Sequence, residues 1–538
     1  MFLWQPQRGL FSLAENKMKR DSFHIAYALF LALRKSSKKV SLIDYGLPTP
    51  FFCNRKKLLL ISLKLGAEIN KKIHSKRVGV VLPPGLAGVV VNIAIFFSGK
   101  IPVNLNFSLG SNIAKTLIEK ADISTIITAQ KMIDKFPDFP WGNDIFEISS
   151  WLKTLSKSPY KLLKDVFFLV LPIPLSSWFL RIPKWQSGKE EATLLFTSGS
   201  SGDPKGVVLT HENLLANCDQ INRLNLFDEN YKILANLPLF HSFGFTVATC
   251  FPLLYNITMV TVPSPLDVKL GIEAIRNEKV NILLGTPTFL KGFLTRSQKE
   301  DFHSLSYVVA GAEKSSLEFI KKWEQKAGCQ YLEGYGLTET SPGISFNLPD
   351  GNAREGSVGK LFNLVECKTI HPDTRINLKK GETGLLCFRG PNVFSGYLNE
   401  IEKTKEVLTS DGWFITGDIG YLDRDNFLYI EGRESRFSKI GGEMVPHGAI
   451  EDEIKKVIQQ NQSDCIEVVI LGKPDENKGE QIILVVDMEI DFQELRNKLR
   501  LNGLPNIWIP KKHVVLREIP HLSSGKTDFI GLKRVIKW

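Results

Sequence analysis

From about residue 78 onward, short apolar runs alternate with longer segments of helical periodicity. The run VGVVLP begins at Val78, a helix-like apolar segment covers about Leu86 to Ser98, and IPVNLN begins at Ile101. Further runs of the same kind follow in the chain: STIIT, ATLLFT, YKILANLP, MVTV, VNILLG and SYVVAGA. Strands that alternate with helices predict parallel, doubly wound sheets, so we expect an α/β fold.

The rest of the chain shows two changes of pattern. TGLLCFRG, GWFITGDIGYLD and FLYIEGR are short strand-like runs with Gly-rich turns, which predicts a small β subdomain. After Gly432 follow an acidic helix over Ile450–Gln460, further strand-like runs and a helix over Phe492–Leu501. A chain of 538 residues is long enough for more than one domain. We expect a large N-terminal domain over residues 1–432, a hinge over 433–436 and a mobile α+β domain over 437–538.

The net charge of +11 is concentrated near the N-terminus. Residues 1–80 contain sixteen Lys or Arg and four Asp or Glu, so the remainder is nearly neutral. These basic residues are not interleaved with aromatic residues in a nucleic-acid recognition motif, and we expect no nucleic-acid partner. Two interpretations of the basic segment stay open: contact with an anionic membrane surface or an acidic protein, or ordinary solvated helix faces.

Cysteine spacing and hydropathy predict a cytoplasmic protein. The seven cysteines include no C-x-x-C pair, which is typical of a reducing compartment. We see no signal-peptide pattern, and no uninterrupted apolar run reaches the roughly eighteen residues of a membrane-spanning helix. The most apolar stretch, VFFLVLPIPLSSWFL over Val166–Leu180, contains two prolines and has basic flanks. It suits shallow insertion into a membrane surface, a gate to an apolar ligand tunnel, or a pair of buried core elements. We expect at most a peripheral association with the inner face of the membrane.

The clearest chemical signal is the string TSGSSGDPKG over Thr197–Gly206, which follows a strand-like run. Its three glycines allow backbone N–H groups to close around phosphate oxygens, its hydroxyls add donors, and Lys205 supplies a cation. It is not a Walker A loop, because the G-x-x-x-x-G-K-[ST] spacing is absent. Taken alone, such a loop is either a flexible linker or a phosphate-binding loop.

This string resembles the phosphate loop of the adenylate-forming superfamily, which includes acyl- and aryl-CoA synthetases, luciferases and peptide-synthetase adenylation domains. Four further signatures of that superfamily follow in the same order: GYGLTE at Gly334–Glu339, TGD at Thr416–Asp418, GR at Gly432–Arg433 and SGK at Ser524–Lys526. The resemblance covers nearly the full chain and implies the adenylate-forming fold, with ATP and Mg²⁺ as cofactors. It implies that a carboxylate attacks the α-phosphate of ATP, pyrophosphate leaves, and a thiol then displaces AMP.

The resemblance also implies which residues bind the nucleotide. The β- and γ-phosphates would lie against the loop residues Thr197, Ser198, Gly199, Ser200, Ser201, Gly202 and Lys205. Tyr335 would stack on adenine, opposite a wall formed by Gly311 and Ala312. Gly336 and Thr338 belong to the same nucleotide-binding set.

Ribose and metal contacts complete the implied site. Asp418 would accept hydrogen bonds from the ribose hydroxyls, together with Arg433. Glu339, as a hard carboxylate ligand, and Thr197 would lie near Mg²⁺.

Three residues are implied to be catalytic. Lys526 would bridge the carboxylate and the α-phosphate during adenylation. Rotation about the hinge-like Gly432–Arg436 would then replace Lys526 by the face around Lys439 for thiol transfer. Family members often have Asp or Lys where this chain has Ser435, so the pivot stays unassigned. His241, in PLFHSFGF, would gate the carboxylate pocket, whose aromatic surroundings suit an apolar acyl tail.

A longer string, SRFSKIGGEMVPH over Ser435–His447, is more specific than the superfamily pattern. Together with PPGLAGVVVNIAIFFSGKIPVNLN and AGAEK, it resembles the acyl-[acyl-carrier-protein] synthetase half of 2-acylglycerophosphoethanolamine acyltransferase. The resemblance implies activation of a fatty acid and its transfer to the phosphopantetheine thiol of acyl carrier protein, in lipid metabolism and phospholipid recycling.

Three alternatives to that function stay open. A long-chain fatty acyl-CoA ligase would use the same adenylation residues with CoA as the acceptor. A lysophospholipid acyltransferase would need a catalytic H-x-x-x-x-D pair, and that spacing occurs only at His447–Asp452, where we expect a structural role. The third alternative is an inactive protein that binds an acyl group or a nucleotide.

Overall fold

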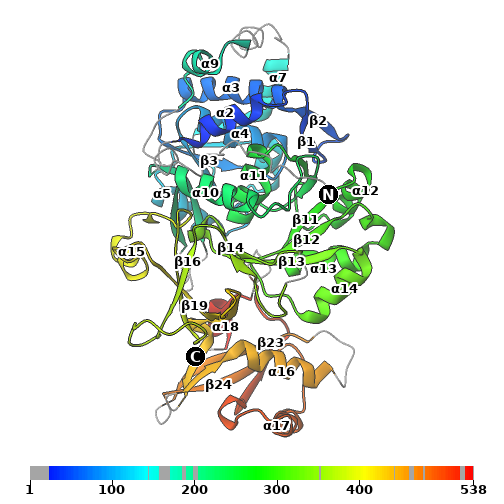
Figure 1. Ribbon diagram of the computed structural model, residues 1–538, viewed down its shortest axis with the longest axis vertical. Coiled ribbons are helices and arrows are strands. Elements are labelled where there is room, and N and C mark those ends of the chain that lie inside the picture. Colours follow the sequence, from blue (N-terminus) through cyan, green and yellow to red (C-terminus); the bar gives the residue numbers. More distant parts are fainter. Residues whose placement is uncertain are drawn as a thin grey trace, which may run out of the picture. The chain divides into compact units, whose positions relative to one another are not determined.

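The structure is a computed structural model that describes residues 23–142, 144–156, 170–183, 189–197, 204–349, 353–440, 443–459, 466–475, 479–521 and 527–536 (Figure 1). The chain divides into two compact units. The first unit comprises Met1–Thr197, Pro204–Glu366 and Arg389–Gly412, and the second comprises Ser198–Asp203, Cys367–Phe388 and Trp413–Trp538.

A nine-stranded sheet forms the centre of the first unit, in the order β15-β14-β13-β12-β11-β9-β10-β1-β2. In that order its strands are Lys360–Leu361, Gly343–Phe346, Gln330–Gly336, Tyr307–Ala310, Ile282–Gly285, Lys232–Ala235, Thr258–Thr261, Val40–Asp44 and Phe51–Asn54. The six strands from β13 to β1 are parallel, whereas β2, β14 and β15 pair antiparallel at the two ends. The predicted parallel strands between residues 231 and 312 therefore all lie in one sheet.

A second sheet has the order β4-β3-β5-β6 and is parallel throughout. Its strands are Ile101–Asn104, Arg77–Val81, Thr125–Thr128 and Asp144–Glu147. A three-stranded antiparallel sheet, β18-β8-β7, contains Gly396–Tyr397, Lys205–Thr210 and Glu191–Thr197.

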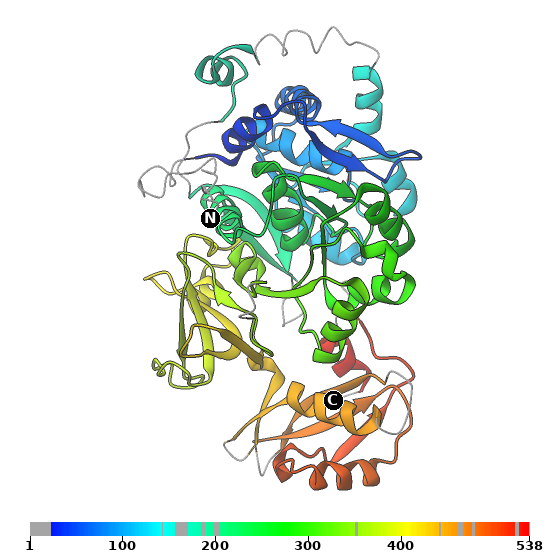
Figure 2. The same ribbon diagram turned by 45° about the vertical axis from the view of Figure 1, so that its right-hand side comes forward.

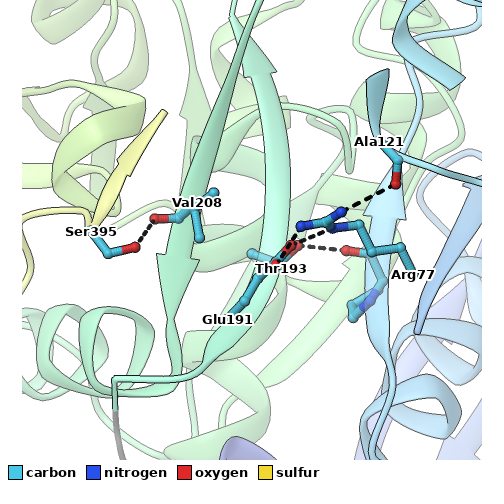
Figure 3. A network of polar contacts seen from close by, with 7 residues as sticks. Arg77, Ala121, Glu191, Thr193, Val208 and Ser395 are labelled. Carbon is cyan, nitrogen blue, oxygen red and sulfur yellow. Dashed lines mark hydrogen bonds and ion pairs between the residues drawn. The ribbon is translucent and has the colours of Figure 1, made fainter. Parts of the chain in front are cut away.

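Polar contacts join these two sheets (Figure 3). Arg77 on β3 donates from Nε and Nη2 to the two carboxylate oxygens of Glu191 on β7, at 2.7 Å each. The Thr193 hydroxyl on β7 donates to the Pro102 carbonyl oxygen on β4 at 2.7 Å. Within the three-stranded sheet, the Ser395 hydroxyl donates to the Val208 carbonyl oxygen at 3.3 Å. The hairpin that carries the TSGSSGDPKG string is therefore attached to the parallel sheet at its base.

Helices pack on these sheets in the alternation that the sequence predicts. The helices of the first unit are α2 (Ile25–Arg34), α3 (Arg55–Lys72), α4 (Leu86–Phe97), α5 (Ser111–Lys120), α6 (Gln130–Lys135), α7 (Ile148–Ser156), α9 (Ile173–Phe179), α10 (His211–Asn222), α11 (Phe251–Leu254), α12 (Val268–Glu278), α13 (Pro287–Arg296), α14 (Leu317–Ala327) and α15 (Ile401–Val407). A core of aliphatic side chains with Phe293, Phe302 and Trp323 fills the space between the large sheet and α12 to α14.

The second unit contains an antiparallel β subdomain and an α+β part. The first sheet, β16-β17-β19-β20, contains Glu366–Ile370, Gly384–Arg389, Phe414–Leu422 and Leu428–Arg433. The second sheet contains β22 (Glu443–Pro446), β21 (Phe437–Ile440), β24 (Gly479–Val486), β23 (Val468–Asp475) and β25 (Lys512–Val515). Helices α16 (His447–Gln459) and α17 (Phe492–Leu501) share an apolar core with this sheet, and α18 (Phe529–Val535) ends the described chain (Figure 2).

The structure adds two strands before residue 78, where the alternating sequence pattern begins. Strands β1 and β2 precede that point, and β1 pairs with β10, whose residues lie more than two hundred positions later. Asp44 at the end of β1 accepts hydrogen bonds from the backbone N–H groups of Leu86 at 2.8 Å and Gly46 at 2.9 Å. Asp44 thus supplies the acceptor at the start of α4, where the preceding Gly85 has no side chain to do so.

The basic N-terminal segment is only in part a set of solvated helix faces, and the described part of the apolar stretch is not buried. Lys35, Lys38 and Lys56 are exposed, as solvated faces require, but Arg55 is buried and donates to the carbonyl oxygens of Ala32 and Leu253 at 2.8 Å each. Residues 170–180, the described part of the VFFLVLPIPLSSWFL stretch, are not a buried core element. Within the described ranges, no helix has the length and apolar character needed to cross a membrane.

Candidate active site

The two ends of the predicted phosphate loop lie opposite each other. Thr197 ends β7, Lys205 begins β8, and the two residues are register partners in the antiparallel pair. Ser198, Gly199, Ser200, Ser201 and Gly202 lie outside the described residues. Because the flanking strands pair directly up to Thr197 and Lys205, the loop closes a hairpin rather than linking separate elements.

Lys205 and Glu339 meet at one tyrosine. The Tyr397 hydroxyl donates to Glu339 Oε1 at 2.8 Å, and the Lys205 ammonium lies 5.0 Å from the centroid of the Tyr397 ring. The Phe394 backbone N–H also donates to the Glu339 carbonyl oxygen at 2.8 Å. A cation, a phenol and a carboxylate are therefore assembled beside the end of the predicted phosphate loop.

The predicted adenine-binding residues come from the ends of two neighbouring parallel strands. Gly311 and Ala312 follow β12, Tyr335 lies near the end of β13, and the two strands pair up to Ala310 and Glu333. A Cβ placed on Gly311 would lie 3.4 Å from the Gly334 carbonyl oxygen, so the two segments are close. Ligands of open parallel sheets bind beyond the carboxyl ends of the strands, which is where these residues lie.

The turn after β13 continues the motif. A Cβ on Gly336 would overlap the Pro342 carbonyl oxygen, so this close approach requires glycine. Thr338 and Glu339 follow in the short 3₁₀ helix η3 (Thr338–Thr340). The Thr338 hydroxyl lies 3.4 Å from the Ser242 hydroxyl, which brings the PLFHSFGF segment to the motif.

His241 is exposed and lies two positions before the start of the π-helix η1 (Phe243–Cys250). Its imidazole lies 4.8 Å from the Phe240 ring, centroid to centroid, and Phe243 Cε1 would lie 3.7 Å from a Cβ on Gly311. The π-helical turn agrees with the tendency of such turns to occur at functional sites.

The second unit brings Asp418 and Arg433 together. They are register partners on β19 and β20, and Arg433 Nε lies 2.6 Å from Asp418 Oδ1. Asp418 is buried, and its backbone N–H donates to the Thr416 hydroxyl oxygen at 2.9 Å. Arg433 is exposed over about half of its side chain, so a partly exposed guanidinium holds the buried Asp418 carboxylate in a fixed position.

Of the two predicted catalytic lysines, only the backbone of one is described. Lys439 lies on β21 opposite Met444, and Lys526 lies outside the described residues. The short 3₁₀ helix η4 (Glu434–Arg436) directly follows β20 at the predicted hinge. The domain boundaries and the hinge stay predictions.

His447 has the environment of a structural residue. Its Nε2 lies 2.8 Å from the Ser438 hydroxyl, and its Nδ1 lies 3.5 Å from Arg436 Nη1. Burial, with Arg436 and Lys533 nearby, lowers the pKa of His447 to about 3. An imidazole with so low a pKa is a poor general base, which supports the structural interpretation of His447–Asp452.

Tyr397 and Ser242 contact predicted site residues, and Glu333 lies two positions before Tyr335; the sequence analysis assigned a role to none of the three. Glu333 accepts a hydrogen bond from the Ser315 backbone N–H at 3.1 Å, and burial raises its pKa. None of the three carries a signal that distinguishes it from other polar residues, because each acts through a partner distant in sequence.

The donor set fits a magnesium nucleotide. Among the described residues, no group of three or more His, Cys, Asp or Glu could hold a metal ion by itself. Mg²⁺ usually takes one or two carboxylates and completes its octahedron with phosphate oxygens and water. The single carboxylate of Glu339 and the hydroxyl of Thr197 agree with that mode.

Comparisons with known proteins identify the family. Residues 68–398 match the family described as AMP-binding enzyme. The long-chain-fatty-acid–CoA ligase of Bacillus subtilis (strain 168) is 27% identical over 507 residues, covering 87% of each chain.

Two solved structures have the same fold at low sequence identity. ATP-bound MatB from Rhodopseudomonas palustris matches with a TM-score of 0.79 at 22% identity, covering 96% of this chain and 99% of its own. The o-succinylbenzoate–CoA synthetase MenE from Bacillus subtilis, in complex with ATP and magnesium, matches with a TM-score of 0.76 at 22% identity, covering 94% and 99%. The predicted fold class is therefore confirmed.

Proposed function

Because the chain belongs to the AMP-binding enzyme family, we propose that it activates a fatty acid with ATP and transfers the acyl group to the thiol of CoA. The similarity to a long-chain-fatty-acid–CoA ligase over 87% of both chains carries this proposal. The assembled Lys205, Tyr397 and Glu339 support it, because adenylation moves negative charge onto phosphate oxygens.

In this proposal the fatty acid carboxylate attacks the α-phosphate of ATP, and pyrophosphate leaves. Lys205 and the loop after Thr197 bind the leaving phosphates, while Tyr335 and the Gly311–Ala312 segment hold adenine. Asp418, with Arg433, orients the ribose. These residues act by positioning and by charge stabilisation.

ATP and Mg²⁺ are the proposed cofactors, as in the MenE complex with ATP and magnesium. Glu339 and Thr197 would hold the ion, which neutralises phosphate charge when bound. The Tyr397 hydroxyl orients the Glu339 carboxylate for that purpose.

The two half-reactions are proposed to use different faces of the C-terminal domain. Lys526 serves adenylation, and the face around Lys439 serves thiol transfer after rotation at residues 433–436. This proposal includes the domain limits 1–432 and 437–538. His241 is proposed to gate the carboxylate pocket.

Acyl carrier protein is the second candidate acceptor. The string over Ser435–His447 favours it, since that string resembles the acyl-[acyl-carrier-protein] synthetases. A role in phospholipid recycling depends on this second candidate. A cytoplasmic location and contact with an anionic membrane surface are also proposals, and the latter is argued below.

The test supplies purified protein with a labelled long-chain fatty acid, Mg²⁺ and ATP, in parallel with CoA, holo acyl carrier protein, apo carrier or lysophospholipid. We expect labelled acyl-CoA. Product on the holo carrier alone would replace CoA by the second candidate. In a separate arm without ATP, transfer of the acyl group from supplied acyl-CoA to lysophospholipid, with release of CoA, would indicate an acyltransferase. The absence of any ATP turnover would contradict every ligase function.

A lysine variant separates the two half-reactions. Lys526→Ala is expected to lose acyl-AMP formation yet to convert supplied acyl-AMP to the thioester, with Lys511→Ala as the matched control. Loss of both half-reactions in Lys526→Ala would contradict the two-state hinge.

A further inference from the structure

Helix α9 has its polar side chains inside and its apolar side chains outside. Ser176 and Ser177 are buried, whereas Trp178 is 71% exposed, and Val170 just before the helix is 80% exposed. Soluble proteins seldom leave such a cluster uncovered, because burial of apolar surface is the main favourable term in folding. We propose that α9 and the residue before it dock this protein on an anionic lipid bilayer.

The inner face of α9 is held in place by hydrogen bonds. Arg34, at the end of α2, donates from Nη1 to the Ser176 hydroxyl at 2.6 Å and from Nη2 to the Leu171 carbonyl oxygen at 3.0 Å. The hydroxyls of Ser176 and Ser177 donate to carbonyl oxygens one turn earlier, at 3.1 and 3.0 Å. These contacts satisfy the serines and Arg34 within the protein, which leaves the apolar side chains to face outward.

The helix is short but has a defined end. Arg181 adopts a left-handed backbone with φ of 52°, and its N–H donates to the Trp178 carbonyl oxygen at 3.0 Å. The Ile182 N–H donates to the Ser177 carbonyl oxygen at 2.9 Å, and the Ile182 side chain is buried. These two hydrogen bonds are the Schellman arrangement, so the orientation of α9 is fixed at its C-terminus.

The two exposed aromatic side chains of α9 pack together. The Trp178 and Phe179 rings pack edge to face with centroids 4.8 Å apart, and Ile173 and Leu175 are also exposed. Both views show α9 at the periphery of its unit, away from the large sheet (Figures 1 and 2). Tryptophan beside aliphatic residues is the composition that favours the boundary between lipid headgroups and acyl chains.

Basic residues accompany α9 in the sequence and at the end of α2. Arg181 is exposed at the end of α9, and Lys35 and Lys38 are exposed just after Arg34. The sequence from 153 to 189 contains seven Lys or Arg and one Asp or Glu. Shallow apolar insertion with surrounding lysines and arginines is complementary to anionic headgroups, whereas the surface of an acidic carrier protein would leave Trp178 and Val170 without an apolar partner.

The docking does not depend on the proposed reaction. If the chain does activate fatty acids, docking would hold it at the surface into which those acids partition. Vesicle binding is therefore measured without ATP or fatty acid, so that failure of the proposed function and failure of the docking are distinguishable.

The experiment sediments the full chain with vesicles of phosphatidylcholine alone or with added phosphatidylglycerol. We expect binding to the anionic vesicles that weakens as salt rises, because salt screens the headgroup charge. Trp178→Ser/Phe179→Ser should lower the partition coefficient by about tenfold or more. The matched control is Leu266→Ser/Ile401→Ser, whose original side chains are 73% and 69% exposed elsewhere on the first unit, and it should bind like the wild type.

A charge variant tests the electrostatic part. Lys35→Gln/Lys38→Gln should lower binding by about fivefold for each lysine and reduce its salt dependence. Lys291→Gln/Lys321→Gln, on α13 and α14, is the control. Four outcomes would overturn the proposal: no wild-type binding, equal binding to neutral vesicles, equal binding by the aromatic variant, or concentration-dependent self-association that this variant abolishes.

Discussion

The Tyr397 hydroxyl offers the most direct test of how the site is built. Tyr397→Phe removes only the donor that reaches Glu339 Oε1 at 2.8 Å. The ring is 8% exposed and keeps its contact with Phe394, whose centroid lies 5.0 Å away. The substitution should therefore leave the local fold intact.

The magnitude follows from the kind of hydrogen bond that is lost. A hydrogen bond to a charged group contributes about 1.5–3 kcal/mol, and Glu339, being only half-buried, should take the lower end. About 1.4 kcal/mol corresponds to a tenfold change in an equilibrium or rate constant. If the hydroxyl orients Glu339 for Mg²⁺, kcat/KM for magnesium-ATP in adenylation should fall by about tenfold.

The assay measures pyrophosphate release over a range of Mg²⁺ concentrations, alongside conversion of supplied acyl-AMP. We expect a higher Mg²⁺ requirement for the first and no change in the second. Tyr45→Phe is the matched control, since its hydroxyl also donates to a glutamate, Glu278, at 3.1 Å away from the predicted site residues. An unchanged Mg²⁺ dependence in Tyr397→Phe, or an equal loss in both half-reactions, would refute the reasoning.

Three further predictions concern nucleotide binding and stability. Asp418→Asn leaves Arg433 without its carboxylate partner and should raise KM for ATP by about tenfold, measured by pyrophosphate release, with little change in the thioester-forming step. Arg77→Lys cannot reproduce the two-pronged ion pair in Figure 3 and should lower the free energy of unfolding by about 2 kcal/mol, measured by denaturant titration; an unchanged midpoint would contradict this. Burial lowers the pKa of His24 to about 4 and that of His211 to about 3, below the unfolded value of 6.5. The two neutral histidines therefore contribute fully to the free energy of unfolding above pH 6.5. As pH falls from 6.5 toward 4, that free energy decreases by about 1.4 kcal/mol per histidine and pH unit. His24→Asn keeps an acceptor for the Ala26 N–H at the start of α2 and removes one titrating group, so thermal unfolding between pH 7 and 5 should depend less on pH in that variant.

The central strands could be predicted because their signal is local. Runs such as VNILLG and SYVVAGA are apolar on both faces, as strands buried between two helical layers must be, and they became β11 and β12. The β subdomain and the helix over Phe492–Leu501 were likewise marked by turns and periodicity within a few residues. Strands β1 and β2 have shorter apolar runs and lie among basic residues. Strand β1 joins the sheet because it pairs with β10, which is distant in sequence.

The candidate site likewise contains residues that local motifs identify and one residue that only the fold identifies. Thr197, Lys205, Gly311, Tyr335 and Glu339 stand in contiguous motifs, so the sequence identifies them by composition and order. Tyr397 has no such mark, because its role depends on β18 pairing with β8, which brings the hydroxyl to a glutamate 58 positions earlier in the chain.

The sequence alone determined the α/β class, the places along the chain of several strands after residue 78, and the motifs of an adenylate-forming enzyme, because each depends on residues close together in the chain. Only the tertiary structure decided that the Tyr397 hydroxyl donates to Glu339, that Asp44 accepts a hydrogen bond from the first residue of α4, and that the serines of α9 are buried. The physical reason is the same in each case. A side chain's direction and partner depend on which distant strand or helix packs against it, and the apolar pattern of α9 by itself was equally consistent with a buried core element.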